Sequence, residues 1–130
     1  MKHTVLRVAR ACSNLDALVA QYLRGLGYEM LSQWRGHEGF DGAVLGHPHA
    51  PYHLEFVHAQ AEPKPPSPHQ ECLLVFYIEA VDDWQRRCEA MIAAGFVAVA
   101  NGNPYWERNG RTFLDAEGGR VVLNWGAWPR

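Results

Sequence analysis

Three polar residues with apolar neighbours are the first candidates for chemistry in this sequence: Arg7, His53 and Glu55. In the run YHLEFV at 52–57, residues 53 and 55 alternate with apolar ones, which predicts that both leave the same face of a strand. An ionised carboxylate there must be paired, protonated or hydrated, so Glu55 is a candidate general base or ligand anchor. His53 could shuttle a proton or contact a ligand, and Arg7 could hold a carboxylate or phosphate.

Aromatic side chains supply a second set of candidate ligand contacts. Tyr77 lies in the apolar run CLLVFYI at 72–78, where it could donate a hydrogen bond to a ligand. Tyr105 and Trp106 lie in the segment NPYWER, which is interpreted as a loop before a strand. These two residues either line a ligand site or close one end of the core, and the sequence leaves both interpretations open.

The remaining histidines and the cysteines carry weaker signals. His47 and His49 form a His-x-His pair, but the neighbouring prolines place them in a turn, where exposed histidines are common. The three cysteines, Cys12, Cys72 and Cys88, are odd in number and have no CxxC spacing. They favour a reducing compartment over a disulfide framework.

Charge and hydropathy exclude several function classes. The net charge of −2 and the pI of about 6.4 lack the basic excess of a nucleic-acid-binding protein. No apolar run approaches the roughly 20 residues that a membrane-spanning helix needs, and the first residues form no apolar signal segment. We therefore expect a cytoplasmic protein with neither nucleic-acid nor membrane partners.

Two helices must position these residues. The first is predicted to begin at the cap residues 13–16, to bury a stripe at helical spacing and to end at Gly27. The second is predicted to open at Asp82, with Gln85 completing a capping box, and to end at Gly95. Its apolar stripe is Val81, Trp84, Cys88, Met91 and Ile92.

Strand signals surround both helices in the same order, so the chain is predicted to contain one unit twice. The expected strands are residues 3–8, 29–34, 41–46, 52–57, 72–78, 96–100, 111–115 and 120–125, with a hairpin turn at 115–119. Each module, at about 1–58 and 71–130, reads strand-helix-strand-strand-strand, and a proline-rich connector at 59–70 separates them. The fold class is α+β.

Alternation along the strands predicts which face of each sheet packs against its helix. The expected helix-facing set is Leu6, Val8, Tyr52, Leu54, Phe56, Leu74, Phe76, Ile78, Val121, Leu123 and Trp125. The opposite faces mix apolar residues with a few polar ones, which is the composition of a small-molecule pocket.

This repeated pattern resembles the vicinal oxygen chelate superfamily, which includes glyoxalases, extradiol dioxygenases and bleomycin-resistance proteins. The matching stretches run from Ser13 to Tyr28, from Tyr52 to Phe56, from Val81 to Phe96 and from Asp115 to Leu123. The segments HAPYHLEF and NPYWERNG are similar to those of uncharacterised glyoxalase-like proteins. The resemblance implies two mixed sheets that curl around a shared cleft, and a homodimer.

The resemblance also implies four positions for metal ligands, of which this sequence keeps two at most. Glu55 matches the fourth-strand carboxylate, and its first-strand neighbour is either His3 or Arg7. In the second module the positions fall on Leu73 or Phe76 and on Val122, none of which can bind a metal. We expect no bound metal, the alternative being Zn, Ni, Fe or Mn held by His3 and Glu55. Arg7 is also the ion-pair partner that the resemblance implies for Glu55.

Two functions follow. The first is a metal-independent binding protein for a small molecule, contacted by Arg7, His53, Glu55, Tyr77, Tyr105 and Trp106. The alternative is an enzyme, either a lyase or an isomerase, with an altered metal site or with Glu55 and His53 as an acid–base pair. The sequence does not identify the ligand.

Overall fold

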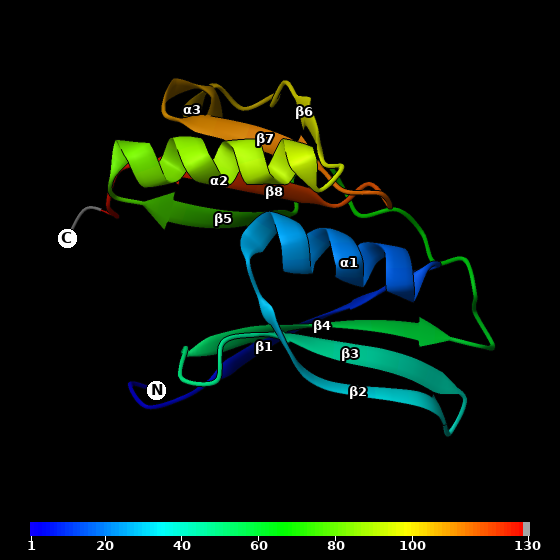
Figure 1. The fold of residues 1–130 in the computed structure, drawn as a ribbon. Helices are drawn as coiled ribbons and strands as arrows, with labels where there is room; N and C mark the ends of the chain where they lie inside the picture. The colour runs from blue at the N-terminus through cyan, green and yellow to red at the C-terminus, as the bar shows by residue number, and fades with distance from the viewer. Residues whose placement is uncertain (129–130) are drawn as a thin grey trace. The chain divides into compact units, whose positions relative to one another are not determined.

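The computed structural model describes residues 1–128 and has two compact units, one from Met1 to Pro66 and one from Ser67 onward (Figure 1). Both are α+β and follow the predicted repeat of strand-helix-strand-strand-strand. Within residues 1–128, no helix is long and apolar enough to cross a membrane.

The first unit contains β1 (Leu6–Ala11), α1 (Leu15–Leu26), β2 (Glu29–His37), β3 (Phe40–Gly46) and β4 (Tyr52–Ala59). Its sheet has the order β1-β4-β3-β2, with β1 parallel to β4 and the other pairs antiparallel. The second unit contains β5 (Leu73–Ile78), α2 (Val81–Ala93), β6 (Val97–Val99), α3 (Pro104–Arg108), β7 (Gly110–Leu114) and β8 (Arg120–Trp125). Its order, β5-β8-β7-β6, repeats the first topology.

Both long helices end as predicted, and α1 also begins as predicted, whereas the start of α2 differs. Asn14 caps α1, because its side-chain oxygen accepts a hydrogen bond from the backbone N–H of Ala17 at 3.1 Å. The cap of α2 is Ala80, which has no side-chain acceptor, so the predicted capping box at Asp82 and Gln85 is wrong. Gly27 and Gly95 follow their helices with φ of 69° and 92°, the left-handed conformation that glycine adopts without strain.

Each sheet buries one face against its own helix. In the first unit, Tyr22 of α1 packs on Phe56 of β4 with ring centroids 4.8 Å apart. In the second, Val121 and Leu123 of β8 are fully buried, and Trp84 of α2 donates a hydrogen bond to the Leu123 carbonyl. These contacts confirm the predicted helix-facing side of both fourth strands.

Three predicted core positions on β1 and β8 are wrong. Leu6, Val8 and Trp125 are 60%, 38% and 45% exposed. The helix α1 packs on β3 and β4, and β1 is the edge strand, so its side chains extend past the helix. Strand β1 also spans 6–11 in place of the predicted 3–8, because its register is set by pairing with β4 from Tyr52 onward.

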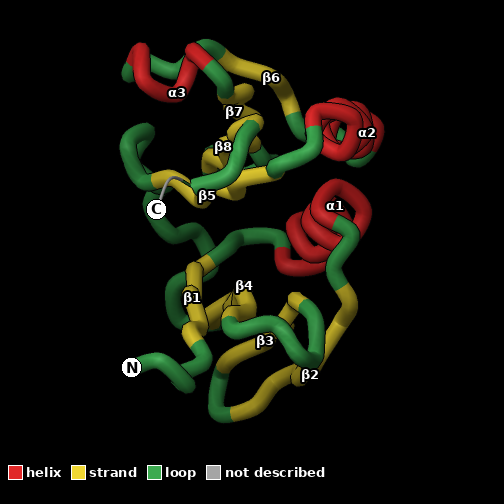
Figure 2. Tube along the Cα trace, turned by 90° about the vertical axis from the view of Figure 1, so that its left-hand side faces the viewer, coloured by secondary structure: helices red, strands yellow, loops and turns green. Residues whose placement is uncertain are grey.

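A short helix replaces the predicted loop at 103–108. Pro104 starts α3, and the side chain of Asn103 accepts a hydrogen bond from the backbone N–H of Tyr105 at 3.0 Å. Figure 2 shows α2 and α3 on opposite sides of the second sheet. The second unit therefore has helical structure on both faces, which its repeat pattern did not predict.

Candidate functional site

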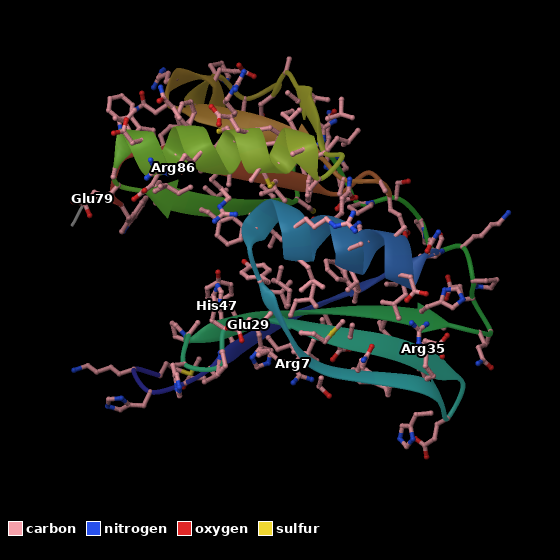
Figure 3. All side chains as sticks on the ribbon, viewed as in Figure 1. Arg7, Glu29, Arg35, His47, Glu79 and Arg86 are labelled. Atoms are coloured by element: carbon pink, nitrogen blue, oxygen red, sulfur yellow. The ribbon has the colours of Figure 1, made fainter. Side chains whose placement is uncertain are left out.

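The face of the first sheet that lies away from α1 brings Arg7, His53 and Glu55 together. In the parallel pairing of β1 and β4, Arg7 lies opposite His53 and Ala9 lies opposite Glu55. All four side chains leave the face opposite Phe56, because side chains alternate along a strand. Figure 3 shows Arg7 on this side of the sheet.

Arg7 binds both of its neighbours. Its Nε donates a hydrogen bond to Nε2 of His53 at 2.8 Å, and its Nη1 donates to Oε1 of Glu55 at 3.0 Å. The expected ion pair between Arg7 and Glu55 is therefore present, with 49% and 16% of the two side chains exposed. Because Nε2 of His53 accepts this hydrogen bond, the ring carries its own hydrogen on Nδ1.

This trio keeps hydrogen-bonding capacity toward solvent. Among residues 1–128, no protein partner is found for Nη2 of Arg7, Nδ1 of His53 or Oε2 of Glu55. Nη2 and Nδ1 are donors and Oε2 is an acceptor, while the charges of Arg7 and Glu55 cancel. The trio is thus electrically neutral and offers both kinds of hydrogen bond to a ligand.

The floor beside the trio is apolar and made of small residues. Val44 of β3 lies opposite Glu55 and is buried, and Gly42 lies opposite Val57. A Cβ on Gly42 would lie 2.1 Å from Cζ2 of Trp34, so the indole ring of β2 lies directly over this glycine. The ring lies in the row of Gly42 and Val57, which is the next row on this face after that of Val44 and Glu55.

A second polar pair lies near Arg7 on the same unit. Nδ1 of His47 is 3.4 Å from Oε2 of Glu29, and Glu29 lies opposite Gly46, which lies opposite His53. The labelled side chains of Arg7, Glu29 and His47 lie at the same end of the unit, and Arg35 lies toward the other end (Figure 3). His47 directly follows β3 and is exposed, as the sequence predicted, and its ring meets that of Tyr28 edge-on at 5.6 Å between centroids.

The corresponding face of the second sheet has lost these groups. Val122 lies between Val121 and Leu123 as Glu55 lies between Leu54 and Phe56, and it is fully buried. Leu73 lies opposite Arg120 as Arg7 lies opposite His53. This register assigns Leu73 to the open first-strand position, because Phe76 lies opposite the helix-facing Leu123.

Helix α3 covers part of this second face. A Cβ on Gly110 would lie 2.3 Å from the carbonyl oxygen of Trp106 and 3.2 Å from Cγ1 of Val122. The backbone of α3 therefore lies against β7, as one of the two interpretations of Trp106 predicts. The predicted ligand contacts Tyr105 and Trp106 belong to this cover, and Tyr105 is 48% exposed.

Tyr77 lies in an aromatic cluster on the second unit. Its ring meets Trp128 edge-on at 5.5 Å between centroids, and the rings of Tyr105 and Trp106 are 4.7 Å apart. Partial burial raises the pKa of Tyr77, and the nearby Tyr105 hydroxyl, hydrogen-bonded to it, raises that pKa further. The structure thus separates the six predicted ligand contacts into two sets, one on each unit.

Comparison with known proteins identifies the family. Residues 6–57 match the YycE-like N-terminal domain, and residues 71–124 match the YycE-like C-terminal domain. The uncharacterized protein YycE of Bacillus subtilis (strain 168) is 35% identical over 118 residues, which cover 91% of this chain and 85% of that protein. The chain belongs to the YycE-like family.

Solved structures place the YycE-like fold in the predicted superfamily. A crystal structure of a YycE protein of unknown function from B. subtilis, grouped with glyoxalase and fosfomycin-resistance proteins, has a TM-score of 0.88 at 32% identity and covers 100% of this chain and 94% of its own. TnmS3, an antibiotic-binding protein from Streptomyces sp. CB03234, has a TM-score of 0.67 at 20% identity and 98% coverage of both chains. FosX, a fosfomycin-resistance protein from Mesorhizobium loti, has a TM-score of 0.67 at 8% identity and covers 91% and 87%. The fold is that of the vicinal oxygen chelate superfamily.

The residues at the superfamily's metal positions do not fit a metal ion in this YycE-like chain. Arg7 puts a fixed cation beside Glu55 and binds it, while Leu73 and Val122 are hydrocarbons. His3 precedes β1 and is exposed, so it does not join Glu55 on the sheet. Within residues 1–128, no group of three or more His, Cys, Asp or Glu side chains is placed to hold a metal.

Sequence reasoning missed two features of the first unit. The contact of Trp34 with Gly42 had one signal, a glycine inside an apolar strand, which often marks close approach by another group. The pair of Glu29 and His47 had none, because it depends on how β2 and β3 turn toward each other.

Proposed function

We propose that this YycE-like protein binds a small organic molecule on the open face of its first sheet, without a metal ion. The observation that carries the proposal is the arrangement of Arg7 between His53 and Glu55, which leaves two donors and one acceptor without a protein partner in residues 1–128. Preorganised polar groups beside an apolar floor are typical of small-molecule sites. The shared fold with antibiotic-binding TnmS3 is compatible with such a role.

The geometry favours binding over the acid–base alternative. A general acid or base needs a polar atom that can reach the reacting proton. Nε2 of His53 and Oε1 of Glu55 both accept hydrogen bonds from the Arg7 guanidinium. A lyase or isomerase using these two residues would have to act through the remaining atoms, Oε2 of Glu55 and the N–H at Nδ1 of His53.

A thermal-shift screen of small molecules, run with and without EDTA, tests the proposal. A ligand at about 100 times its dissociation constant should add roughly 2.7 kcal/mol of stability, a shift of several degrees. We expect hits whose shifts are unchanged by EDTA and are lost in Arg7→Gln. The exposed Arg86→Gln, whose arginine pairs with Asp83 on α2, is the matched control.

Metal analysis of the same preparations gives an independent check. Protein purified without chelator should contain far less than one transition metal per chain. Stoichiometric zinc, nickel, iron or manganese, or ligand binding that EDTA abolishes, would contradict the proposal and favour an enzyme.

We also infer a cytoplasmic homodimer. Val5, Leu6 and Val8 expose 56%, 60% and 38% of their surface along the edge strand β1, and Cys72 is an exposed free thiol. A second copy would shelter the apolar edge, and a reducing compartment would preserve the thiol. Light scattering should give the mass of a dimer, and Leu6→Lys should give a monomer; a wild-type monomer would contradict the inference.

A further inference from the structure

The charge of the trio restricts the polar group that a ligand can bring to it. The Arg7 cation is already paired with Glu55 at 3.0 Å, and only 16% of the Glu55 side chain is exposed. A ligand carboxylate placed on Nη2 of Arg7 would be attracted by the guanidinium and repelled by the nearby Glu55 carboxylate. The two effects oppose each other, so an anionic ligand gains little from this arginine.

The hydrogen-bonding atoms of the trio favour a different group. Nη2 of Arg7 donates, while Oε2 of Glu55 accepts and can be satisfied only by a donor on the ligand. A group that accepts and donates from adjacent atoms, such as a primary carboxamide, would satisfy both without adding charge. A carboxylate cannot donate, so it would leave Oε2 facing a second anion.

The floor restricts the body of the ligand. Val44 is buried opposite Glu55, Ala9 lies beside them on β1, and the indole of Trp34 covers Gly42 within 2.1 Å of where a Cβ would be. In the rows of Glu55 and Gly42, the other residues of β1, β3 and β4 are Ala9, Ala11, Val44 and Val57, and none of them is aromatic. A planar apolar body could lie along these rows and stack on the indole, with its polar group at Arg7.

We propose that the ligand of this face is a planar, uncharged molecule whose polar end both accepts and donates hydrogen bonds, with a carboxamide or a hydroxyl beside a carbonyl as the chemical class. The inference rests on the proposed function, since it specifies the ligand of the same site. It goes further by assigning Glu55 the role of excluding anions. Arg7 by itself would favour anionic ligands. Glu55 opposes that preference and is thus a specificity-determining residue.

Two probes of the same shape test this assignment: 2-naphthamide and 2-naphthoate. Their dissociation constants are measured by NMR titration at neutral pH, where only naphthoate is charged. For the wild-type protein we expect 2-naphthamide to bind at least about fivefold more tightly than 2-naphthoate. Its affinity should also change little with salt concentration, because no net charge is involved.

Glu55→Gln is the decisive variant. It keeps the size of the side chain and leaves Arg7 as an uncompensated cation, so the preference should reverse and 2-naphthoate should bind more tightly. Glu89→Gln removes a carboxylate of the same kind from the exposed surface of α2 and should bind both probes like the wild type. Circular dichroism and urea unfolding of each variant establish that it is folded.

The outcomes separate this inference from the proposed function. Tighter binding of naphthoate by the wild type, or an equal change for both probes in Glu55→Gln, would overturn the neutral-ligand inference and leave the proposed function intact. Binding of neither probe would also overturn the inference, and the proposed function would then be decided by the wider thermal-shift screen. The neutral-ligand inference is supported only if the wild type prefers 2-naphthamide and Glu55→Gln prefers 2-naphthoate, while Glu89→Gln behaves like the wild type.

Discussion

The two sheets of this protein have the same topology, but the face that lies away from the long helix carries different side chains in each. On the first sheet this face is open and polar, with Arg7 hydrogen-bonded to His53 and Glu55. On the second it is apolar at the same register positions, Leu73 and Val122, and α3 lies against it. The duplicated topology thus provides two matching positions, and the side chains that occupy them differ between the two sheets.

The largest expected effect comes from exchanging the two central residues. Val122→Glu places a carboxylate at a fully buried position without a cation, so it should lower the free energy of unfolding by roughly 3–5 kcal/mol. Glu55→Val only removes a partly exposed ion pair and should cost about 1 kcal/mol or less. Urea unfolding of both variants measures the difference. Equal losses would show that the two faces are not distinct environments.

Alanine at the two close-contact glycines should have the next largest effect. Gly110→Ala brings a Cβ to 2.3 Å from the Trp106 carbonyl, so the backbone of α3 must move, at a cost of about 3 kcal/mol. Gly42→Ala meets the Trp34 ring, which can rotate away, and should cost about 1–2 kcal/mol with a change in tryptophan fluorescence. Gly102→Ala has open space around its Cβ and is the control. A Gly110 variant as stable as the control would remove the evidence that α3 covers the second face.

The smallest effects concern the starts of the two helices. Asn14→Ala removes the side-chain cap of α1 and should destabilise the protein by about 1 kcal/mol. Ala80→Ser should stabilise it by about 0.5–1 kcal/mol, since Ala80 has extended φ and ψ of −81° and 127° but no capping oxygen. Thermal unfolding distinguishes the two signs. A loss of stability in both variants would indicate that α2 begins elsewhere.

The sequence predicted the repeated fold because periodic patterns and glycine stops are local signals. The helix ends at Gly27 and Gly95 and the central strands follow directly from them. The exact span of β1 could not be predicted, since its parallel partner β4 sets the register from 46 residues away. Helix α3 had a local signal in Asn103 and Pro104, a cap residue followed by the residue favoured at the first helical position.

The candidate site was predictable only in part. Alternation placed His53 and Glu55 on one face, but their shared contact with Arg7 depends on the pairing of β1 with β4. The position of His3 before β1 became known only with the start of that strand at Leu6. The register likewise chose Leu73 over Phe76.

The central claim, that the first sheet alone carries the ligand site, is tested most directly by NMR mapping with 2-naphthamide. The account predicts shifts in the backbone amides of Ala9, Val44 and Glu55 and in the indole N–H of Trp34, with Val75 and Val122 unchanged. These residues occupy matching positions on the two sheets, which makes them internal controls. Shifts confined to Val75, Val122 and their neighbours would contradict the account, because they would place the site on the second sheet.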